Sequence, residues 1–171
     1  SDLISFGIAP SLIFYNKFLM DTGRVGIVIA FLFLLCGALR LARFNANINN
    51  VSSDYFQGLP IPGAALAILS YILISLEFGE YFNNVFVAAP YLAFYALLMI
   101  SNVPFPSFKQ SDSVRKHKRK ILFLIFIVIS LLFIYEELMI GVIITLYVIS
   151  SIIYAIINRN KFRGIVDWDE R

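Results

Sequence analysis

The sequence predicts an all-α protein, a polytopic bundle of transmembrane helices. Of its 171 residues, 60% are hydrophobic and only 15% are charged, and the mean hydropathy is +0.82. These values lie outside the range of ordinary soluble domains. The apolar residues form long runs and do not alternate with polar ones as membrane β-strands require. A helical membrane bundle is the architecture that fits both observations.

Six apolar runs mark the expected spans. Several are shorter than the roughly 20 residues that a helix needs to cross about 30 Å of hydrocarbon, so polar flanks must complete those spans. The runs are Leu3–Met20, Val25–Leu39, Ile61–Leu76, Val85–Ile100, Ile121–Tyr135 and Leu138–Ile157. We therefore expect a single transmembrane domain over residues 1–171, in which residues 159–171 form a polar cytoplasmic tail.

Basic residues are unevenly distributed between the alternate ends of these runs. Lys17 and Arg24 fall on one side, and the other twelve of the 14 lysines and arginines fall on the opposite side. Because basic loops are retained in the cytoplasm, the twelve-residue side is expected to be cytoplasmic. Asp2, the end of the second run, the loop 58–62 and the segment 101–109 would then share that face.

Arg40 and Arg43 close the second run, three residues apart and on one side of the predicted helix. At a rise of 1.5 Å per residue, Arg40 lies about 4.5 Å deeper than Arg43, among small residues such as Gly37 and Ala42. An arginine near the end of a membrane helix is often only an interfacial anchor. Two guanidinium groups so close together also suit a phosphate or carboxylate, which they bind through paired hydrogen bonds.

Four other residues at this face are candidates for the same site. Asp2 is either a helix N-terminal acid, favoured by the helix dipole, or a metal ligand or general base. Pro60 and Pro62 force an extended entry into the third run and would hold backbone near the interface, although they also suit a plain helix start. Lys109 follows a second pair of spaced prolines and could meet an anionic group.

Three features carry no catalytic interpretation. The basic run 115–120 is typical of a topology signal and of attraction to anionic lipid headgroups. It lacks interleaved aromatic residues, so no nucleic-acid partner is expected. His117 in this run has no partner ligands nearby in the sequence. Cys36, the one cysteine, lies inside an apolar run and is expected to be a packing residue.

Four stretches together resemble the integral-membrane CDP-diacylglycerol–serine O-phosphatidyltransferases, a group within the CDP-alcohol phosphatidyltransferase family. They are DLISFGIAP at 2–10, CGALRLARFN at 36–45, GLPIPGAA at 58–65 and LMISNVPFPSFK at 98–109. The resemblance covers Asp2 to about Lys109, and the last two apolar runs match in hydropathy only.

The signature of that family is D-x2-D-G-x2-A-R-x8-G-x3-D-x3-D, and Asp2 is similar to its final aspartate. The preceding three aspartates are not in this sequence. The resemblance therefore implies that the 171 residues are the C-terminal part of a longer chain of about eight spans. One carboxylate cannot hold Mg²⁺ or Mn²⁺ against a diphosphate, so the fragment alone is expected to be inactive.

The resemblance also implies an activity: transfer of a phosphatidyl group from CDP-diacylglycerol to the hydroxyl of L-serine, which yields phosphatidylserine and CMP. Asp2 would act as general base and metal ligand. Arg40, Arg43 and Lys109 would contact either the diphosphate or the serine carboxylate, beside Pro60 and Pro62. A multi-pass protein of the cell membrane with a cytoplasmic active site, membrane-lipid contacts and a homodimeric state is expected.

Three alternatives are weighed against this hypothesis. A related enzyme could use another alcohol, such as glycerol phosphate. A transporter would bury charges near the membrane midplane and show paired repeats, whereas here the ionisable residues gather at one face and no internal repeat is evident. A structural membrane subunit is the plainest alternative. The pattern favours chemistry at a membrane surface.

Overall fold

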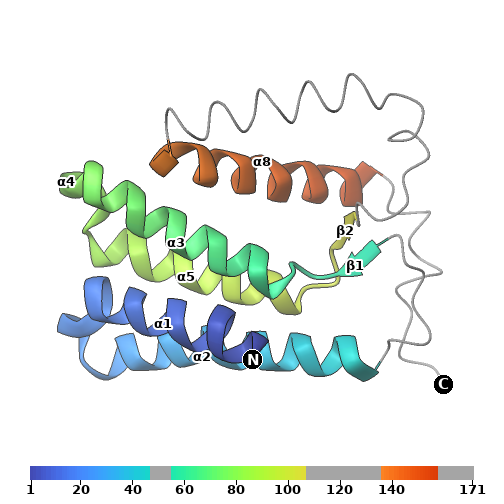
Figure 1. Cartoon of the computed structure of the whole chain (residues 1–171), viewed down its shortest axis with the longest axis horizontal. Coiled ribbons are helices and arrows are strands. Elements are labelled where there is room, and N and C mark those ends of the chain that lie inside the picture. The colour runs from blue at the N-terminus through green and yellow to red at the C-terminus, as the bar shows by residue number, and fades with distance from the viewer. Residues whose placement is uncertain (47–54, 107–135, 158–171) are drawn as a thin grey trace.

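The protein is an all-helical bundle whose helices run back and forth side by side (Figure 1). The computed structural model describes residues 1–46, 55–106 and 136–157. The principal helices are α2 (Arg24–Ala46), α3 (Ile61–Glu77), α5 (Val85–Ile100) and α8 (Glu136–Ile157), with the short α4 (Gly79–Phe82) between α3 and α5. α2 packs mainly against α5, and α3 packs mainly against α8.

The apolar runs predict these helices closely. α5 has the predicted bounds, and α3 ends one residue beyond its prediction. By length and composition, two of the described helices could cross a membrane, at Arg24–Ala46 and Leu138–Ile157, and α3 and α5 are shorter apolar helices. The fifth run, Ile121–Tyr135, and the tail 159–171 lie outside the described residues.

The first run forms one continuous helical segment of changing pitch. It comprises the π-turn η1 (Ile4–Ile8), α1 (Ala9–Phe14), a second π-turn η2 (Tyr15–Leu19) and the 3₁₀ turn η3 (Met20–Thr22). Pro10 has no N–H and its ring would press on the carbonyl one turn earlier, so the helix widens before it. The N–H of Ala9 accordingly donates to the carbonyl of Ile4, five residues back.

α2 continues beyond its apolar run. The predicted run ends at Leu39, yet the helix reaches Ala46. Both Arg40 and Arg43 are therefore held on regular helix, which fixes the angle and the depth between them.

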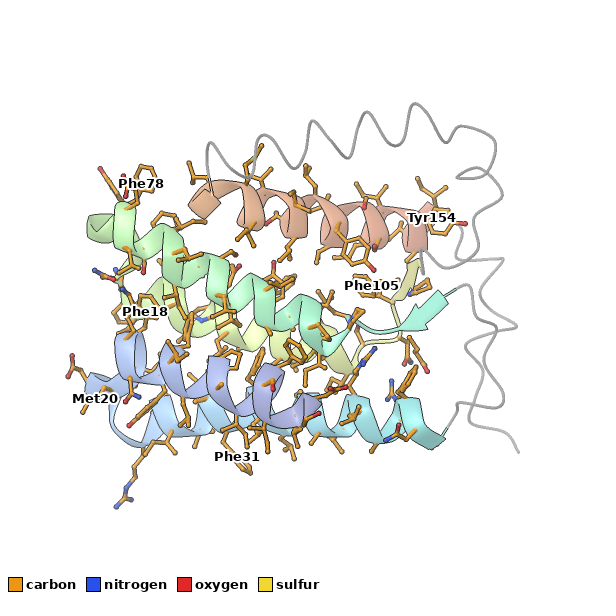
Figure 2. The ribbon with its side chains drawn as sticks, in the orientation of Figure 1. Phe18, Met20, Phe31, Phe78, Phe105 and Tyr154 are labelled. Carbon is orange, nitrogen blue, oxygen red and sulfur yellow. The ribbon has the colours of Figure 1, made fainter. Side chains whose placement is uncertain are left out.

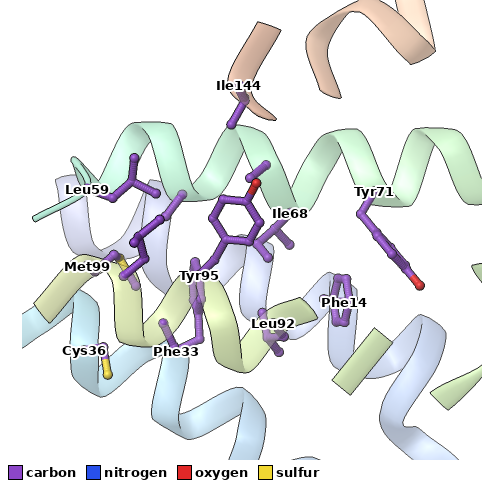
Figure 3. Close-up of a cluster of buried hydrophobic side chains, with 14 of the residues drawn as sticks. Phe14, Phe33, Cys36, Leu59, Ile68, Tyr71, Leu92, Tyr95, Met99 and Ile144 are labelled. Carbon is purple, nitrogen blue, oxygen red and sulfur yellow. The ribbon is translucent and has the colours of Figure 1, made fainter. Parts of the chain in front are cut away.

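Aromatic and aliphatic side chains from α1, α2, α3, α5 and α8 fill the core (Figure 3). The Tyr71 ring is part of an aromatic cluster and lies 5.5 Å from the ring of Phe14 and 4.6 Å from that of Tyr91, measured between centroids. Buried hydroxyls are satisfied inside the bundle, as an apolar solvent demands. Ser11 Oγ donates to the carbonyl of Ala30 over 2.7 Å, which joins α1 to α2.

Apolar side chains also cover the outside of the bundle. Figure 2 shows Phe31 pointing away from α2 and Met20 at the far end of the first helical segment, and their side chains are 59% and 63% exposed. Cys36, in contrast, is buried in the core, as the sequence predicted. An outer surface of this kind suits contact with lipid.

A small antiparallel ribbon, absent from the sequence-based prediction, joins the start of α3 to the end of α5. Its strands are β1 (Tyr55–Gln57) and β2 (Pro104–Pro106), with Phe56 opposite Phe105. Gly58 follows β1 with a φ of 75°, which L side chains rarely adopt. A Cβ there would overlap the carbonyl oxygen of Met99 and lie 2.9 Å from that of Ser101. Only glycine allows this close approach.

Gly58→Ala is expected to destabilise the protein, because it combines an unfavourable φ with a clash against backbone atoms that cannot move aside. Backbone strain of this kind costs about 1–3 kcal/mol. The measurement is thermal unfolding in detergent. Gly63→Ala is the matched control, because Gly63 is helical and its Cβ would meet only Leu59 at ordinary contact distance. Equal melting temperatures for the two variants would contradict the assignment.

Candidate active site

The described parts of the four segments that were predicted to share one face lie toward one end of the bundle. Figure 1 shows the N-terminus of the first helical segment, the C-terminal end of α2, the start of α3 and the end of α5 turned toward the same end. The turns before α2 and around α4 lie at the opposite end. The up-and-down course of the helices produces this grouping.

Gly37 of α2 is the point where these segments touch. Its missing side chain leaves room for two neighbours: a Cβ there would lie 2.8 Å from Cδ1 of Ile61 and 3.9 Å from Cδ1 of Leu3. Leu3 follows Asp2 directly, and Ile61 lies between Pro60 and Pro62. The first helical segment and the start of α3 therefore both meet α2 three residues before Arg40.

Arg40 is a buried cation whose charge the described residues leave uncompensated. Its side chain is only 9% exposed. Within the described part of the chain its recorded interaction is with the ring of Phe44, 5.6 Å from Cζ to the ring centroid. A cation buried without an anionic partner is costly, whereas a bound phosphate or carboxylate would compensate it. Arg40 is thus the side chain best suited to receive an anion.

Arg43, one turn later, is exposed and already engaged. Its Nη1 donates to the carbonyl oxygen of Ile100 over 3.2 Å and to Oδ1 of Asn102 over 3.3 Å. Ile100 is the last residue of α5, where helix carbonyls lack partners within the helix. Arg43 therefore caps α5, and it joins that helix to α2.

Asp2 lies in the exposed first turn of the first helical segment, where the backbone N–H groups of Ile4 and Ser5 donate to the carbonyl of Ser1. An acid is electrostatically favoured in that first turn. No group of three His, Cys, Asp or Glu side chains among the described residues could hold a metal ion. The described residues alone therefore do not fit a metal centre, and Asp2 could supply one ligand at most.

The two prolines start α3. Pro60 is the N-cap residue, with φ −58° and ψ 137°, and Pro62 lies exposed in the first turn. The carbonyl of Pro60 accepts from the N–H of Ala64. Proline side chains offer no hydrogen-bond donors, so these residues shape the site through the backbone. Lys109 lies outside the described residues.

Two polar side chains at this end were not singled out from the sequence. Gln57 Nε2 donates to Oδ1 of Asn102 over 2.9 Å, so Asn102 receives donors from both β1 and α2. Asn102 lies within one of the motif stretches, but a lone asparagine between a helix and a proline gives no signal of such a role.

The chain is similar in sequence to several known proteins. No protein-family model matches the chain. It is 35% identical to the CDP-diacylglycerol–serine O-phosphatidyltransferase of Helicobacter pylori, over 94% of this chain and 70% of that protein. It is 38% identical to the protein of the same name from Methanocaldococcus jannaschii, over 63% of this chain and 47% of that one.

A third relative is the archaetidylserine synthase of Methanothermobacter thermautotrophicus, 38% identical over 62% of this chain and 42% of that protein. The names of these relatives agree with the resemblance carried by the four motif stretches. Together with the extent of the match to the Helicobacter pylori protein, they show that this chain belongs to the CDP-diacylglycerol–serine O-phosphatidyltransferase family.

Proposed function

We propose that the end of the bundle where the motif segments meet is the site at which a phosphatidyl group is transferred from CDP-diacylglycerol to L-serine. The observation that carries the proposal is Arg40, a buried cation with no anionic partner among the described residues, at the end of the bundle where the motif segments meet. Membership of the family indicates the substrates, since two relatives named CDP-diacylglycerol–serine O-phosphatidyltransferase match most of the chain.

In the proposed reaction the serine hydroxyl oxygen attacks the lipid-linked phosphorus of CDP-diacylglycerol. A new P–O bond forms, the bond between that phosphorus and the CMP oxygen breaks, and CMP leaves. Asp2 accepts the hydroxyl proton as general base. Arg40 compensates the negative charge of the diphosphate or of the serine carboxylate, as Arg43 and Lys109 are also proposed to do.

Pro60 and Pro62 are proposed to border the substrate through backbone that they hold rigid. Mg²⁺ or Mn²⁺ is proposed as cofactor, and it would neutralise the diphosphate. Asp2 would be one of its ligands, and the others would come from beyond the described residues.

The proposed setting is the cell membrane. Six spans are supported by the alternating direction of the described helices and by the apolar run 121–135. A cytoplasmic site is supported by the sequence pattern, which assigns twelve of the 14 Lys and Arg residues to that face, and it suits the water-soluble serine and CMP. The lipid tails would stay in the bilayer. A homodimer is proposed from family likeness.

Serine should be the preferred acceptor in the full natural chain. The measurement is CMP release from CDP-diacylglycerol in mixed micelles with Mg²⁺ or Mn²⁺, with serine or glycerol phosphate added separately. Serine is expected to raise the rate well above the acceptor-free background. Faster turnover with glycerol phosphate would reassign the substrate, and no release with either would refute the transfer activity.

Asp2→Asn should lower kcat by about 10²-fold or more, because the amide cannot accept the serine proton. Asp21→Asn is the matched control, since Asp21 is an exposed acid at the opposite end of the same helical segment. Steady-state kinetics on both variants, with melting temperatures to confirm folding, test the assignment. Unchanged turnover in Asp2→Asn would remove its role as base.

Arg40→Gln should lower kcat/KM about 30-fold or more, because a charge-assisted hydrogen bond to substrate is lost. The melting temperature without substrate should stay level or rise, since the substitution removes an uncompensated buried charge. Arg24→Gln, an exposed arginine at the other end of α2, is the control. Lower stability with normal kinetics would identify Arg40 as a structural anchor.

A further inference from the structure

The ribbon at the mouth of the site is firmly attached to the bundle. The N–H of Gly58 donates to the carbonyl of Val103 over 2.9 Å, just beyond the paired strands. On the far side, Phe105 of β2 is fully buried, and its ring lies 5.6 Å from that of Tyr147 on α8. Figure 2 shows Phe105 between the ribbon and α8. Side chains carried by this ribbon therefore have a fixed platform.

Asn102 lies between that platform and α2. Its Oδ1 accepts from Gln57 Nε2 over 2.9 Å and from Arg43 Nη1 over 3.3 Å. The bond from Gln57 holds the amide oxygen in place, so the arginine meets an acceptor that is already oriented. The carbonyl of Ile100 gives Nη1 a second acceptor.

Both recorded bonds of Arg43 use a single nitrogen. A guanidinium has five N–H donors in one plane, and the two hydrogens on Nη1 suffice for two acceptors. In the described part of the chain, the three donors on Nε and Nη2 have no recorded partner. Because the guanidinium group is planar and rigid, holding Nη1 in place also sets the directions of the N–H bonds on Nε and Nη2.

We propose that Asn102 is a positioning residue, which acts through Arg43 by holding its guanidinium so that the three remaining N–H donors are presented to an anionic substrate group. This inference rests on the proposed function, and it adds a residue and a role to that site. Asn102 itself need not touch substrate. Its effect depends on Arg43 being present.

The test is a double-mutant cycle in the full natural chain, with Asn102→Leu, Arg43→Gln and the double variant. Asn102→Leu keeps the side-chain size and removes the acceptor. It is expected to lower kcat/KM on the order of tenfold, mainly through a higher KM for CDP-diacylglycerol or for serine, as loss of a bond to a charged group predicts. In the Arg43→Gln background the same change should have less than about twofold effect, because neighbours acting together are not additive.

Asn83→Leu is the matched control, an exposed asparagine at the opposite end of the bundle. Gln57→Leu provides a second route should Asn102→Leu fail to fold, and it should raise the same KM by a smaller factor. Equal losses in both backgrounds, or a fall in kcat alone with both KM values unchanged, would overturn the inference.

The proposed function is judged separately, by whether the wild-type chain releases CMP with serine. Should it release none, the same four proteins are compared by the rise in melting temperature that CDP-diacylglycerol and serine each produce. If Asn102→Leu reduces this rise in melting temperature only when Arg43 is present, the positioning role is supported. If Asn102→Leu leaves the rise unchanged, or reduces it equally with and without Arg43, the positioning role is overturned.

Discussion

The carbonyl groups at the C-terminal end of α5 need hydrogen-bond donors, and this need determines how the neighbouring helix ends pack. These carbonyls have no partners within the helix, and near an apolar solvent each unsatisfied carbonyl is costly. The chain supplies donors from elsewhere: the N–H of Leu59 and the hydroxyl of Ser101 bind the carbonyl of Leu98, and Arg43 binds that of Ile100. Satisfying one helix end thus draws in the start of α3 and the end of α2, and Gly58 makes the approach sterically possible.

This requirement gives the two arginines different surroundings. Arg43 is exposed, and its Nη1 donates hydrogen bonds to the end of α5 and to Asn102. These bonds stabilise the packing of α2 against α5. Arg40 is buried, and the described residues give its charge no anion. A buried cation without an anionic partner is destabilising. The absence of such a partner among the described residues is the physical ground for proposing that an anionic group binds at this end of the bundle.

Most of the helical architecture could be predicted from the sequence. An apolar run of sufficient length has few alternatives to a helix in a membrane, and the bounds of α3 and α5 agree with their runs to within a residue. The ribbon could not be predicted. Its strands are three residues long, contain two prolines, and pair with a segment nearly fifty positions away. Nothing local in such strands favours a sheet. The catalytic or binding roles predicted for six residues stay predictions: Asp2, Arg40, Arg43, Pro60, Pro62 and Lys109.

The sequence by itself determined the all-α class of the protein, the bounds of α3 and α5 to within a residue and, through four motif stretches, its family. These follow from composition and local order, which are properties of neighbouring residues. Only the tertiary structure decided that Arg43 is hydrogen-bonded to the end of α5, that Arg40 has no anionic partner among the described residues, and that Asn102 and Gln57 lie beside Arg43. Those facts depend on hydrogen bonds between residues distant in the chain, which exist only once packing has brought the helix ends together.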